Sequence, residues 1–463
     1  MGNSGAGVSA GTFKILVENG EYRLHNRGDI AMMAITVERL RERWPRARIG
    51  MLTDEPRVLR GLLPQVEPVV SRTGGHWGRS GLAGMMDEQA GVHLIGPAAL
   101  QWRAMTDMPK RHLRDATDRA RREVHRLTLR DLRPAPTGLD LPPVPAALAA
   151  SDLVVALGGS YLTDVDPRQA HRTLNLLEAA QHHGIPNVMT GQGLGPIHDP
   201  ELRRRAAEVL PDVDLIAVRE GRYGPALLAE LGVPADRILV TGDDAVEFAY
   251  RVRRSAIGAD LGVCLRISKK SKVSDAARDT LTTVLRREAG DLDVALAPLI
   301  VSEHEDEDRR HTLPLLADAT RTRPALARTG TAQDLVRQVA RCRVVVTSAY
   351  HLALFALSQG IPAVAVTASR YYDDKFHGLA DAFDSATADA GLRIVHLDVD
   401  NLDAELTRAV RQLWESAPEV RDTLQQRAVE QIDAGRAGLD RVAGLVAGGE
   451  AGPVTVAEPR QGD

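Results

Sequence analysis

The chain has 463 residues but few cysteines and lysines, and these shortages exclude several kinds of protein. Cys264 and Cys342 are the only cysteines, so a disulfide framework is excluded and a reducing compartment is indicated. Neither a CxxC pair nor an HExxH motif occurs, which argues against a structural zinc site or a zincin protease. We therefore expect no metal.

Charge and hydropathy exclude two further classes. Because 58 basic residues face 62 acidic ones, for a net charge of −4, there is no basic excess and we expect no nucleic acid partner. Residues 344–369 carry no charge, but His351, Gln359, Gly360 and Pro362 interrupt this stretch, which suits a strand, a helix and a strand better than a membrane span. The N-terminus lacks the pattern of a signal peptide, so we expect a cytoplasmic protein without a membrane span.

Strand and helix patterns alternate along two blocks of the chain, and this alternation is typical of parallel sheets covered by helices. The strands that we predict cover 13–17, 47–52, 153–157, 187–190, 215–218 and 238–240 in the first block, and 261–267, 294–300, 344–347 and 363–366 in the second. The predicted fold class is therefore α/β, with two Rossmann-like doubly wound domains that face a cleft, as in glycosyltransferase-B-like proteins. Ligands of such sheets bind outside the carboxyl ends of the strands.

Composition places the domain boundaries. Five prolines between 133 and 145 mark a loop inside a less regular stretch, 72–150, which we interpret as an elaboration of the first domain. A long helix is predicted over 402–445, with Pro418 as the place where it could break. The expected organisation is a flexible N-terminus at 1–12, an N-terminal α/β domain at 13–245, a linker at 246–260, a C-terminal α/β domain at 261–445 and a disordered tail at 446–463.

Glycines follow two of the predicted strands in the first domain. Gly158 and Gly159 come after one strand, and Gln192 and Gly193 lie in a glycine-rich turn after the next. Glycine lets the backbone approach a ligand and exposes amide groups to an anion, although tight turning alone explains such glycines equally well. The spacing is not GxGxxG, so a dinucleotide site is not indicated.

Cations and hydrogen-bond donors also occur at strand ends. Asn26, Gly28 and Asp29 precede a helix whose free N–H groups suit a phosphate or carboxylate, although Asp29 alone is as readily a helix cap. Arg266 ends a strand of the second block and is followed by Lys269 and Lys270, in a chain with only six lysines. Strand-end cations of this kind bind phosphate or carboxylate, and the competing interpretation is a solvated basic loop.

His351 follows Ser348 and Tyr350 at a strand-to-helix turn of the second block. A histidine at the start of a helix can act as a general acid or base near neutral pH, and the helix start lowers its pKa. Tyr372 and Lys375 follow the next strand, so polar groups converge there. We interpret the acidic loop at 303–308 as a solvated loop and helix start.

Taken in order, these segments resemble the polysaccharide pyruvyl transferase family over about residues 13–385, except for 72–150. The resemblance rests on Asn26-x-Gly28-Asp29, Gly158-Gly159-Ser160, Gly191-Gln192-Gly193-Leu194-Gly195-Pro196, Arg219-Glu220, Gly242-Asp243, Gly262-Val263-x-Leu265-Arg266, Tyr350-His351-x-Ala353-x-Phe355-Ala356, Gly360-Ile361-Pro362 and the segment 372–378.

This resemblance implies an enzyme that moves a pyruvyl group from phosphoenolpyruvate to the hydroxyls of a glycan or glycosylated small molecule, forming a ketal. It implies that Arg266 binds the anionic donor, that His351 is the acid or base, and that no further cofactor takes part. One position departs from the family pattern: Ala349 stands where the family commonly has an arginine, two residues before the histidine. Lys269, Lys270 or Lys375 could supply the missing charge.

Two other functions stay open. A nucleotide-sugar-dependent glycosyltransferase would use the same cleft, and both Ala349 and the lysine cluster suit it. A non-catalytic member of the family would bind a carbohydrate or a partner, with 72–150 as the contact surface. The expected partners are a small-molecule donor and a carbohydrate-containing acceptor; the sequence does not fix the oligomeric state, so a homo-oligomer stays open.

Overall fold

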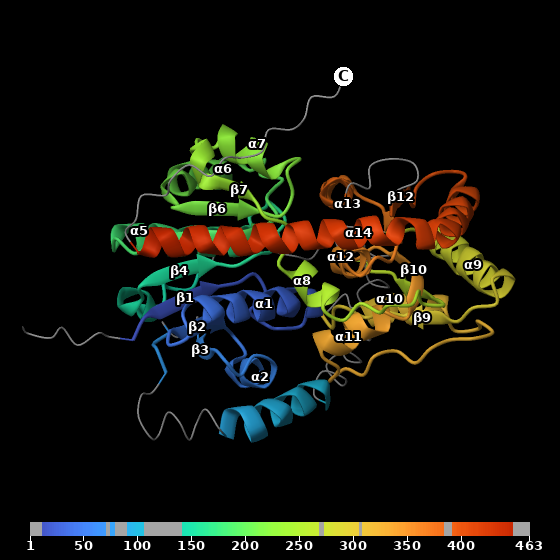
Figure 1. Ribbon diagram of the computed structural model, residues 1–463, viewed down its shortest axis with the longest axis horizontal. Helices are drawn as coiled ribbons and strands as arrows, with labels where there is room; N and C mark the ends of the chain where they lie inside the picture. Colours follow the sequence, from blue (N-terminus) through green and yellow to red (C-terminus); the bar gives the residue numbers. More distant parts are fainter. Residues whose placement is uncertain are drawn as a thin grey trace, which may run out of the picture.

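The structure is a computed structural model, which describes residues 12–70, 75–78, 90–105, 141–267, 273–304, 308–383 and 391–447. Two parallel sheets occupy two lobes of the molecule, one from each half of the chain (Figure 1). Lys269 and Lys270, the terminal stretches 1–11 and 448–463, and most of 72–150 lie outside the described residues. Within the described part of the chain, no helix combines the length and the apolar character that a membrane crossing requires.

The first sheet has seven parallel strands in the order β3-β2-β1-β4-β5-β6-β7. These strands are β1 (Lys14–Glu18), β2 (Arg48–Thr53), β3 (Glu67–Val70), β4 (Leu153–Ala156), β5 (Asn187–Gln192), β6 (Leu215–Val218) and β7 (Ile238–Val240). The helices between them are α1 (Arg27–Arg43), α2 (Pro56–Leu62), α5 (Pro167–His182), α6 (Pro200–Val209) and α7 (Gly224–Glu230). The five inner strands are almost entirely buried, as expected of a sheet covered on both faces, whereas the edge strands β3 and β7 are partly exposed.

The second sheet has five parallel strands in the order β12-β11-β10-β8-β9. They are β8 (Asp260–Cys264), β9 (Leu296–Pro298), β10 (Cys342–Thr347), β11 (Ala363–Thr367) and β12 (Leu392–His396). The helices of this lobe are α9 (Asp275–Asp291), α10 (Asp308–Leu315), α11 (Ala332–Val339), α12 (Tyr350–Ser358) and α13 (Arg370–Ala382). Every residue of α12 is buried, so this helix lies in the centre of the molecule.

The long helix α14 (Leu402–Val446) runs across both lobes (Figure 1). Its C-terminal part returns to the first lobe, where Arg436 pairs with Glu42 of α1 at 3.5 Å. Pro418 does not break the helix. The carbonyl that Pro418 leaves without its helical partner is that of Trp414, and Arg343 Nε of β10 donates to it at 2.8 Å. A hydrogen bond from outside the helix therefore replaces the one that proline removes.

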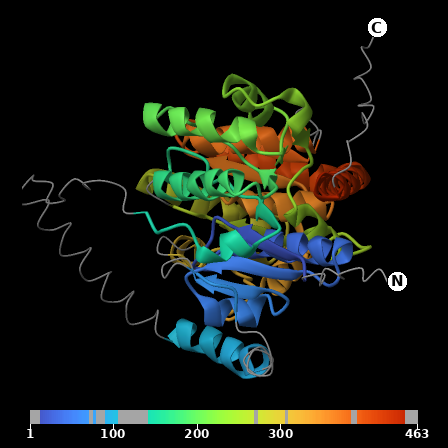
Figure 2. The same ribbon diagram turned by 90° about the vertical axis from the view of Figure 1, so that its left-hand side faces the viewer.

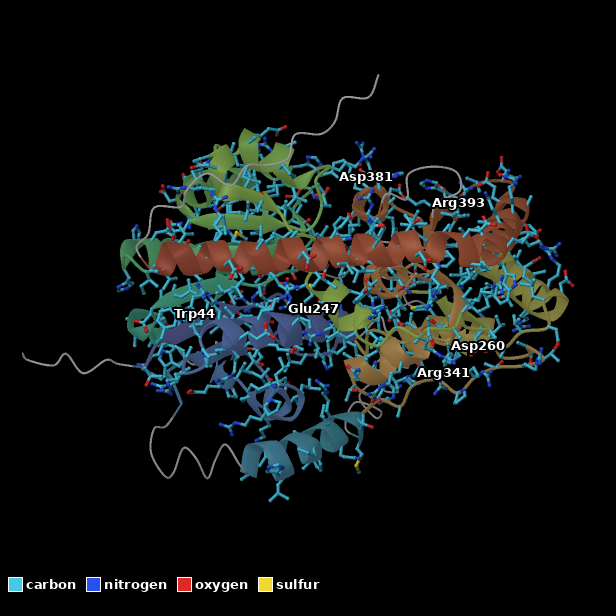
Figure 3. All side chains as sticks on the ribbon, in the orientation of Figure 1. Trp44, Glu247, Asp260, Arg341, Asp381 and Arg393 are labelled. Carbon is cyan, nitrogen blue, oxygen red and sulfur yellow. The ribbon has the colours of Figure 1, made fainter. Side chains whose placement is uncertain are left out.

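The segment expected as a linker contains most of helix α8 (Ala245–Tyr250), which packs between α1, α12 and α14. Glu247 of α8 lies beneath α14 (Figure 3) and binds three arginines: Arg39 of α1, Arg251 and Arg436 of α14. When the view of Figure 1 is turned by 90° about the vertical axis, the blue-to-green elements of the first lobe lie in front of the orange elements of the second (Figure 2). The ion pairs of the buried Glu247 thus join α8 to α1 and α14.

Candidate functional site

The N-terminus of α1 is docked onto the second lobe. Asn26 caps this helix, because its side chain accepts a hydrogen bond from Gly28 N at 3.0 Å. The neighbouring Arg27 is buried, and its backbone N–H donates to the carbonyl of Val301 at 2.8 Å. The Arg27 guanidinium donates to four further carbonyls of the second lobe and pairs with Glu303 at 3.4 Å; the carbonyls belong to Ile300, Ala327, Arg328 and Gly330.

This contact corrects the interpretation of residues 303–308 as a solvated loop. Glu303 lies 9% exposed and also pairs with Arg309 and Arg328, while Asp308 is fully buried. Residues 305–307 lie outside the described part of the chain. The charges at both ends of this acidic run are therefore structural: one receives Arg27 from the first lobe, and the other binds a strand-end arginine.

His351 lies directly against the start of α1. A Cβ atom added to Gly28 would lie only 2.3 Å from Cγ and Nδ1 of the His351 ring, so only glycine leaves room for the imidazole. His351 is 8% exposed, and its Nε2 has no hydrogen-bond partner among the residues that the structure describes. Oδ1 of Asp29 lies 3.9 Å from this nitrogen. Two side chains that sequence reasoning singled out separately thus face one another across the lobes.

The surroundings of this pair move both pKa values in opposite directions. Burial, together with the charges of Glu21 and Asp243, raises the pKa of Asp29 to about 7 against the opposing charges of Arg266 and Lys375. Burial also lowers the pKa of His351 well below its usual value, with the positive charges of Arg219, Arg266 and Lys375 acting in the same direction. At neutral pH the imidazole is therefore uncharged and the carboxyl group is about half protonated.

Arg266 stands beside the pair but is already held by a carboxylate. Its Nε and Nη2 donate to the two oxygens of Asp308 at 2.7 and 3.1 Å. Because the Asp308 carboxylate is buried, these two hydrogen bonds hold the Arg266 guanidinium in place. Ser348 Oγ accepts the backbone N–H of Arg266 at 2.7 Å, so Ser348 ties β8 to the turn before α12. Ser348 thus holds the strand end that carries Arg266, and its contact with a donor stays a prediction.

A second arginine, Arg219, belongs to the site, although the sequence marks it only as part of a family motif and not as a candidate site residue. It follows β6 and is buried, with Asp243 at 3.4 Å and Ser160 Oγ at 2.7 Å as partners. Its guanidinium lies 3.9 Å from the centre of the Tyr350 ring, a cation–π contact between the lobes. The signal that could have identified it was present, since Arg219 is a charged residue directly after a buried strand, at the same edge as the glycines.

The glycine turns of the first lobe support this arginine. A Cβ on Gly193 would lie 2.7 Å from the Arg219 guanidinium, so the backbone there makes space for the side chain. The amide of Gln192 donates to the carbonyls of Ala156 and Leu157 and to the Tyr161 hydroxyl, each at 2.9 Å. Gln192 is buried, and its amide N–H groups hold the turn, while its donor-binding role stays a prediction.

Gly158 and Gly159 serve the same turn. A Cβ on Gly158 would come within 2.8 Å of the Gly191 carbonyl oxygen, and Gly159 has a φ of +154° and accepts a hydrogen bond from Gly193 N at 2.8 Å. Both glycines are thus required by close approach of two strand ends. The turning interpretation, which the sequence left open, accounts for these contacts.

Helix α13 brings the remaining predicted residues towards the pair. Lys375 Nζ lies 4.1 Å from the centre of the Tyr371 ring and 5.7 Å from that of Tyr372. The positive charge of Lys375 acts on both Asp29 and His351, and the Tyr372 hydroxyl group acts on Arg266. The site thus combines a neutral histidine, the carboxyl groups of Asp29 and Asp243, whose pKa values burial raises to about 7 and about 6, and cations that follow β6 and β8 or belong to α13.

This fold and this placement of polar groups at strand ends of two parallel sheets define a two-domain α/β enzyme of the glycosyltransferase-B type. The solved structure of a putative UDP-N-acetylglucosamine 2-epimerase from Listeria monocytogenes superposes with a TM-score of 0.56 and 12% identity, covering 96% of this chain and 100% of the other. The S. aureus MnaA–UDP structure gives a TM-score of 0.53 and 11% identity, with 94% and 97% covered. At such identities the likeness shows the fold alone, and it confirms the predicted fold class.

Comparison of the sequence with family models identifies a family within this fold class. The family model of polysaccharide pyruvyl transferases matches residues 26–370, and the chain belongs to this family of transferases. The resemblance found from the strand-end motifs is therefore confirmed. No curated protein matches the chain.

Proposed function

We propose that this protein transfers a pyruvyl group from phosphoenolpyruvate to two hydroxyls of a carbohydrate-containing acceptor, which is a glycan or a glycosylated small molecule. The observation that carries the proposal is the pairing of a neutral His351 with Asp29 at 3.9 Å among the cations Arg219, Arg266 and Lys375. Within the described part of the chain, Nε2 of His351 has no hydrogen-bond partner. Proton transfer and anion binding are thereby brought to one place.

The donor requires such a place because it carries a carboxylate and a phosphate. Arginine forks and a lysine are suited to these groups, and the site receives them from both lobes. Ala349, which stands where the family commonly has an arginine, is fully buried. Arg219 stacks on the ring of the next residue, Tyr350, and so supplies a cation to this turn from the opposite lobe.

The reaction joins two acceptor oxygens to one carbon of the donor. A proton is added to the methylene carbon of phosphoenolpyruvate while the first hydroxyl oxygen bonds to the adjacent carbon and loses its proton. The bond to the phosphate oxygen then breaks, and the second hydroxyl oxygen bonds to the same carbon and loses its proton. The products are a ketal that carries one new C–H bond and one phosphate that has taken up the second proton. No redox change occurs, so the scheme calls for no cofactor beyond the donor.

A ligand screen by thermal shift tests this assignment. Phosphoenolpyruvate at about 100 times its Kd should stabilise the protein by about 2.7 kcal/mol, or roughly 5–10 °C in Tm. Inorganic phosphate and pyruvate serve as controls, and Arg219→Met should weaken the response to phosphoenolpyruvate by about tenfold or more in concentration. Stabilisation by nucleotide diphosphates with no response to phosphoenolpyruvate would overturn the proposal.

Such an outcome would favour the second candidate, a nucleotide-sugar-dependent glycosyltransferase. The specific observation in its favour is Ala349, because the donor-binding pattern of the family is incomplete there. Arg219 and Lys375 would suit a diphosphate as well as they suit phosphoenolpyruvate. A response to neither donor, with binding of a carbohydrate, would favour the non-catalytic alternative.

A further inference from the structure

Pyruvyl transfer needs an acid for the methylene carbon and a base for the attacking hydroxyl, and the two lobes each contribute one such group. We propose that Asp29 is the general acid and His351 the general base, so that the catalytic pair is assembled from both lobes of the molecule. This inference rests on the proposed function and assigns the proton steps within it. It also changes the expected role of Asp29 from donor binding or helix capping to catalysis.

The geometry supports a shared site for one reacting group. Nε2 of His351 and Oδ1 of Asp29 are 3.9 Å apart, which is too long for a hydrogen bond between them. Both atoms can nevertheless lie within about 2.8 Å of a single oxygen placed between them. An acceptor hydroxyl in this position would donate its proton to the unpartnered Nε2 and leave the carboxyl group next to the carbon that must be protonated.

Helix α1 does not use Asp29 as its cap. Asn26 is the N-cap, and its side chain already accepts the Gly28 N–H at 3.0 Å. Asp29 lies in the first turn with 22% of its side chain exposed, and it makes no hydrogen bond that would hold it to the helix backbone among those found in the described residues. The carboxyl group is therefore available to a reactant.

Arg27 holds the pair together across the lobes. Its side chain donates to four carbonyls of the second lobe and pairs with Glu303, and it immediately precedes Gly28 and Asp29. Gly28 in turn touches the His351 ring. We therefore regard Arg27 as a positioning residue: it fixes where Asp29 and His351 face one another but does not itself act on the reactants.

The electrostatic surroundings favour a protonated Asp29 carboxyl group and a neutral His351 imidazole at the start of the reaction. The charged groups that face Asp29 are Glu21, Asp243, Arg266 and Lys375, with His351 opposite, and their sum together with burial raises its pKa to about 7. The same burial keeps His351 neutral. Below pH 7 the carboxyl group thus carries the proton needed by the methylene carbon, while the imidazole keeps the lone pair needed by the hydroxyl.

The two groups return to their starting states within one turnover. In the first half, Asp29 gives its proton to the methylene carbon and His351 takes the proton of the first hydroxyl. In the second half, the imidazolium gives its proton to the departing phosphate oxygen, and the Asp29 carboxylate takes the proton of the second hydroxyl. Two hydroxyl protons are consumed, one ends in the methyl group and one on phosphate, and neither residue is changed.

The kinetic test compares Asp29→Asn with Asp381→Asn. Asp381 also bridges the lobes, through Arg222 at 2.8 Å and near the top of their junction in Figure 3, but the site does not include it. Asp29→Asn should lower kcat by about 10²–10⁴-fold, with stabilisation by phosphoenolpyruvate within about threefold of the wild-type midpoint concentration. Asp381→Asn should leave kcat within about twofold. A kcat of Asp29→Asn within threefold of wild type would overturn the assignment.

The pH dependence gives a second kinetic test. Because the acid must be protonated, kcat/KM of the wild type should fall as the pH rises through about 7, and this limb should be absent in the residual activity of Asp29→Asn. The second pKa of a phosphate group lies near 6, so the donor contributes a limb of its own, which both proteins share. A high-pH limb that is unchanged in Asp29→Asn would refute the role of Asp29.

A measurement without turnover separates this inference from the proposed function. The imidazole nitrogens of His351, assigned by comparison with His351→Asn, should show an NMR titration with a midpoint near pH 7 that reports the protonation of Asp29. This titration should disappear in Asp29→Asn. If it is observed but no pyruvyl transfer occurs, the proposed function fails and the paired groups stand. If it is absent while transfer occurs, the pairing fails and the function stands.

Discussion

A single methyl group placed on Gly28 should separate the two lobes at the site. In Gly28→Ala the new Cβ would lie 2.3 Å from two atoms of the His351 ring and 2.6 Å from its Cβ, whereas carbon contacts are favourable at about 3.5–4.0 Å. The ring or the start of α1 must therefore move by more than about 1 Å. A misplacement of that size at a catalytic group costs about 100-fold in rate, so kcat should fall by this factor.

The stability change should be moderate by comparison. Overpacking of a core position costs about 1–3 kcal/mol, and Gly28 has no left-handed backbone conformation that alanine would strain. A loss of 1–3 kcal/mol corresponds to roughly 2–12 °C in Tm for domains of this size. The assays are turnover with phosphoenolpyruvate and thermal unfolding of the same preparation.

Two control variants give this test its specificity. In Gly290→Ala, also in a helix, the new Cβ meets nothing within 4 Å, so turnover should be unchanged and stability should rise by up to about 1 kcal/mol. In a His351→Ala background the two ring contacts at 2.3 Å are gone and only the contact with the Cβ at 2.6 Å remains, so Gly28→Ala should cost less stability than in the wild type, a non-additivity expected of residues in contact. Wild-type turnover and stability in Gly28→Ala would show that His351 does not pack against α1.

Three other outcomes can be checked on the same scale. His351→Asn should lower turnover by about 10²–10⁴-fold while leaving donor binding and Tm largely intact, and a lower Tm with normal turnover of the folded fraction would make this histidine purely structural. Arg266→Ala should raise the donor Kd by about 10–100-fold and, by leaving the buried Asp308 without its arginine, destabilise the protein by about 3–5 kcal/mol. Adding Asp308→Ala removes the unpaired charge but also the acceptor of the Val301 and Ser302 N–H groups, so stability should return only in part and donor affinity should stay low; an unchanged donor Kd in Arg266→Ala would remove Arg266 from the donor site. Burial raises the pKa of Glu247, but hydrogen bonds and charge from Arg436, Arg39 and Arg251 lower it from 4.5 to about 2, so its contribution of about 3 kcal/mol is present above pH 4.5 and lost as the pH falls towards 2. Glu247→Gln should therefore flatten this acid limb in urea unfolding measurements, and an unchanged limb would contradict the pairing.

The fold could be predicted from the sequence because strands of parallel sheets are buried and read as short apolar runs, with helices between them. The break at Pro418 could not be judged in the same way, because the helix depends on a hydrogen bond from Arg343, 71 residues away, to the Trp414 carbonyl. Helix α8 could not be predicted either. It lies in the segment expected as a linker, and its ion pairs are with residues of α1 and α14, which are distant in the sequence.

The sequence could identify those site residues that lie directly after a predicted strand. His351, Arg266 and Asp29 each follow a recognisable strand-to-helix turn, yet only the packing of Gly28 against the imidazole shows that two of them are paired. The roles of Gln192 and Ser348 could not be inferred, since both use their polar atoms on backbone groups of neighbouring strands. Tertiary contacts decide whether a polar side chain faces a ligand or binds the backbone of a neighbouring strand, and a sequence pattern does not show these contacts.

The most direct test of the central claim is transfer in heavy water. The purified protein is incubated in D₂O with phosphoenolpyruvate and a panel of glycans that carry neighbouring hydroxyls, and the products are examined by NMR and mass spectrometry. We predict a pyruvate ketal on one acceptor class, release of one phosphate per ketal, and a single deuterium in each new methyl group, with all three lost in His351→Asn. Transfer of a sugar from a nucleotide donor under the same conditions, with phosphoenolpyruvate untouched, would contradict the account.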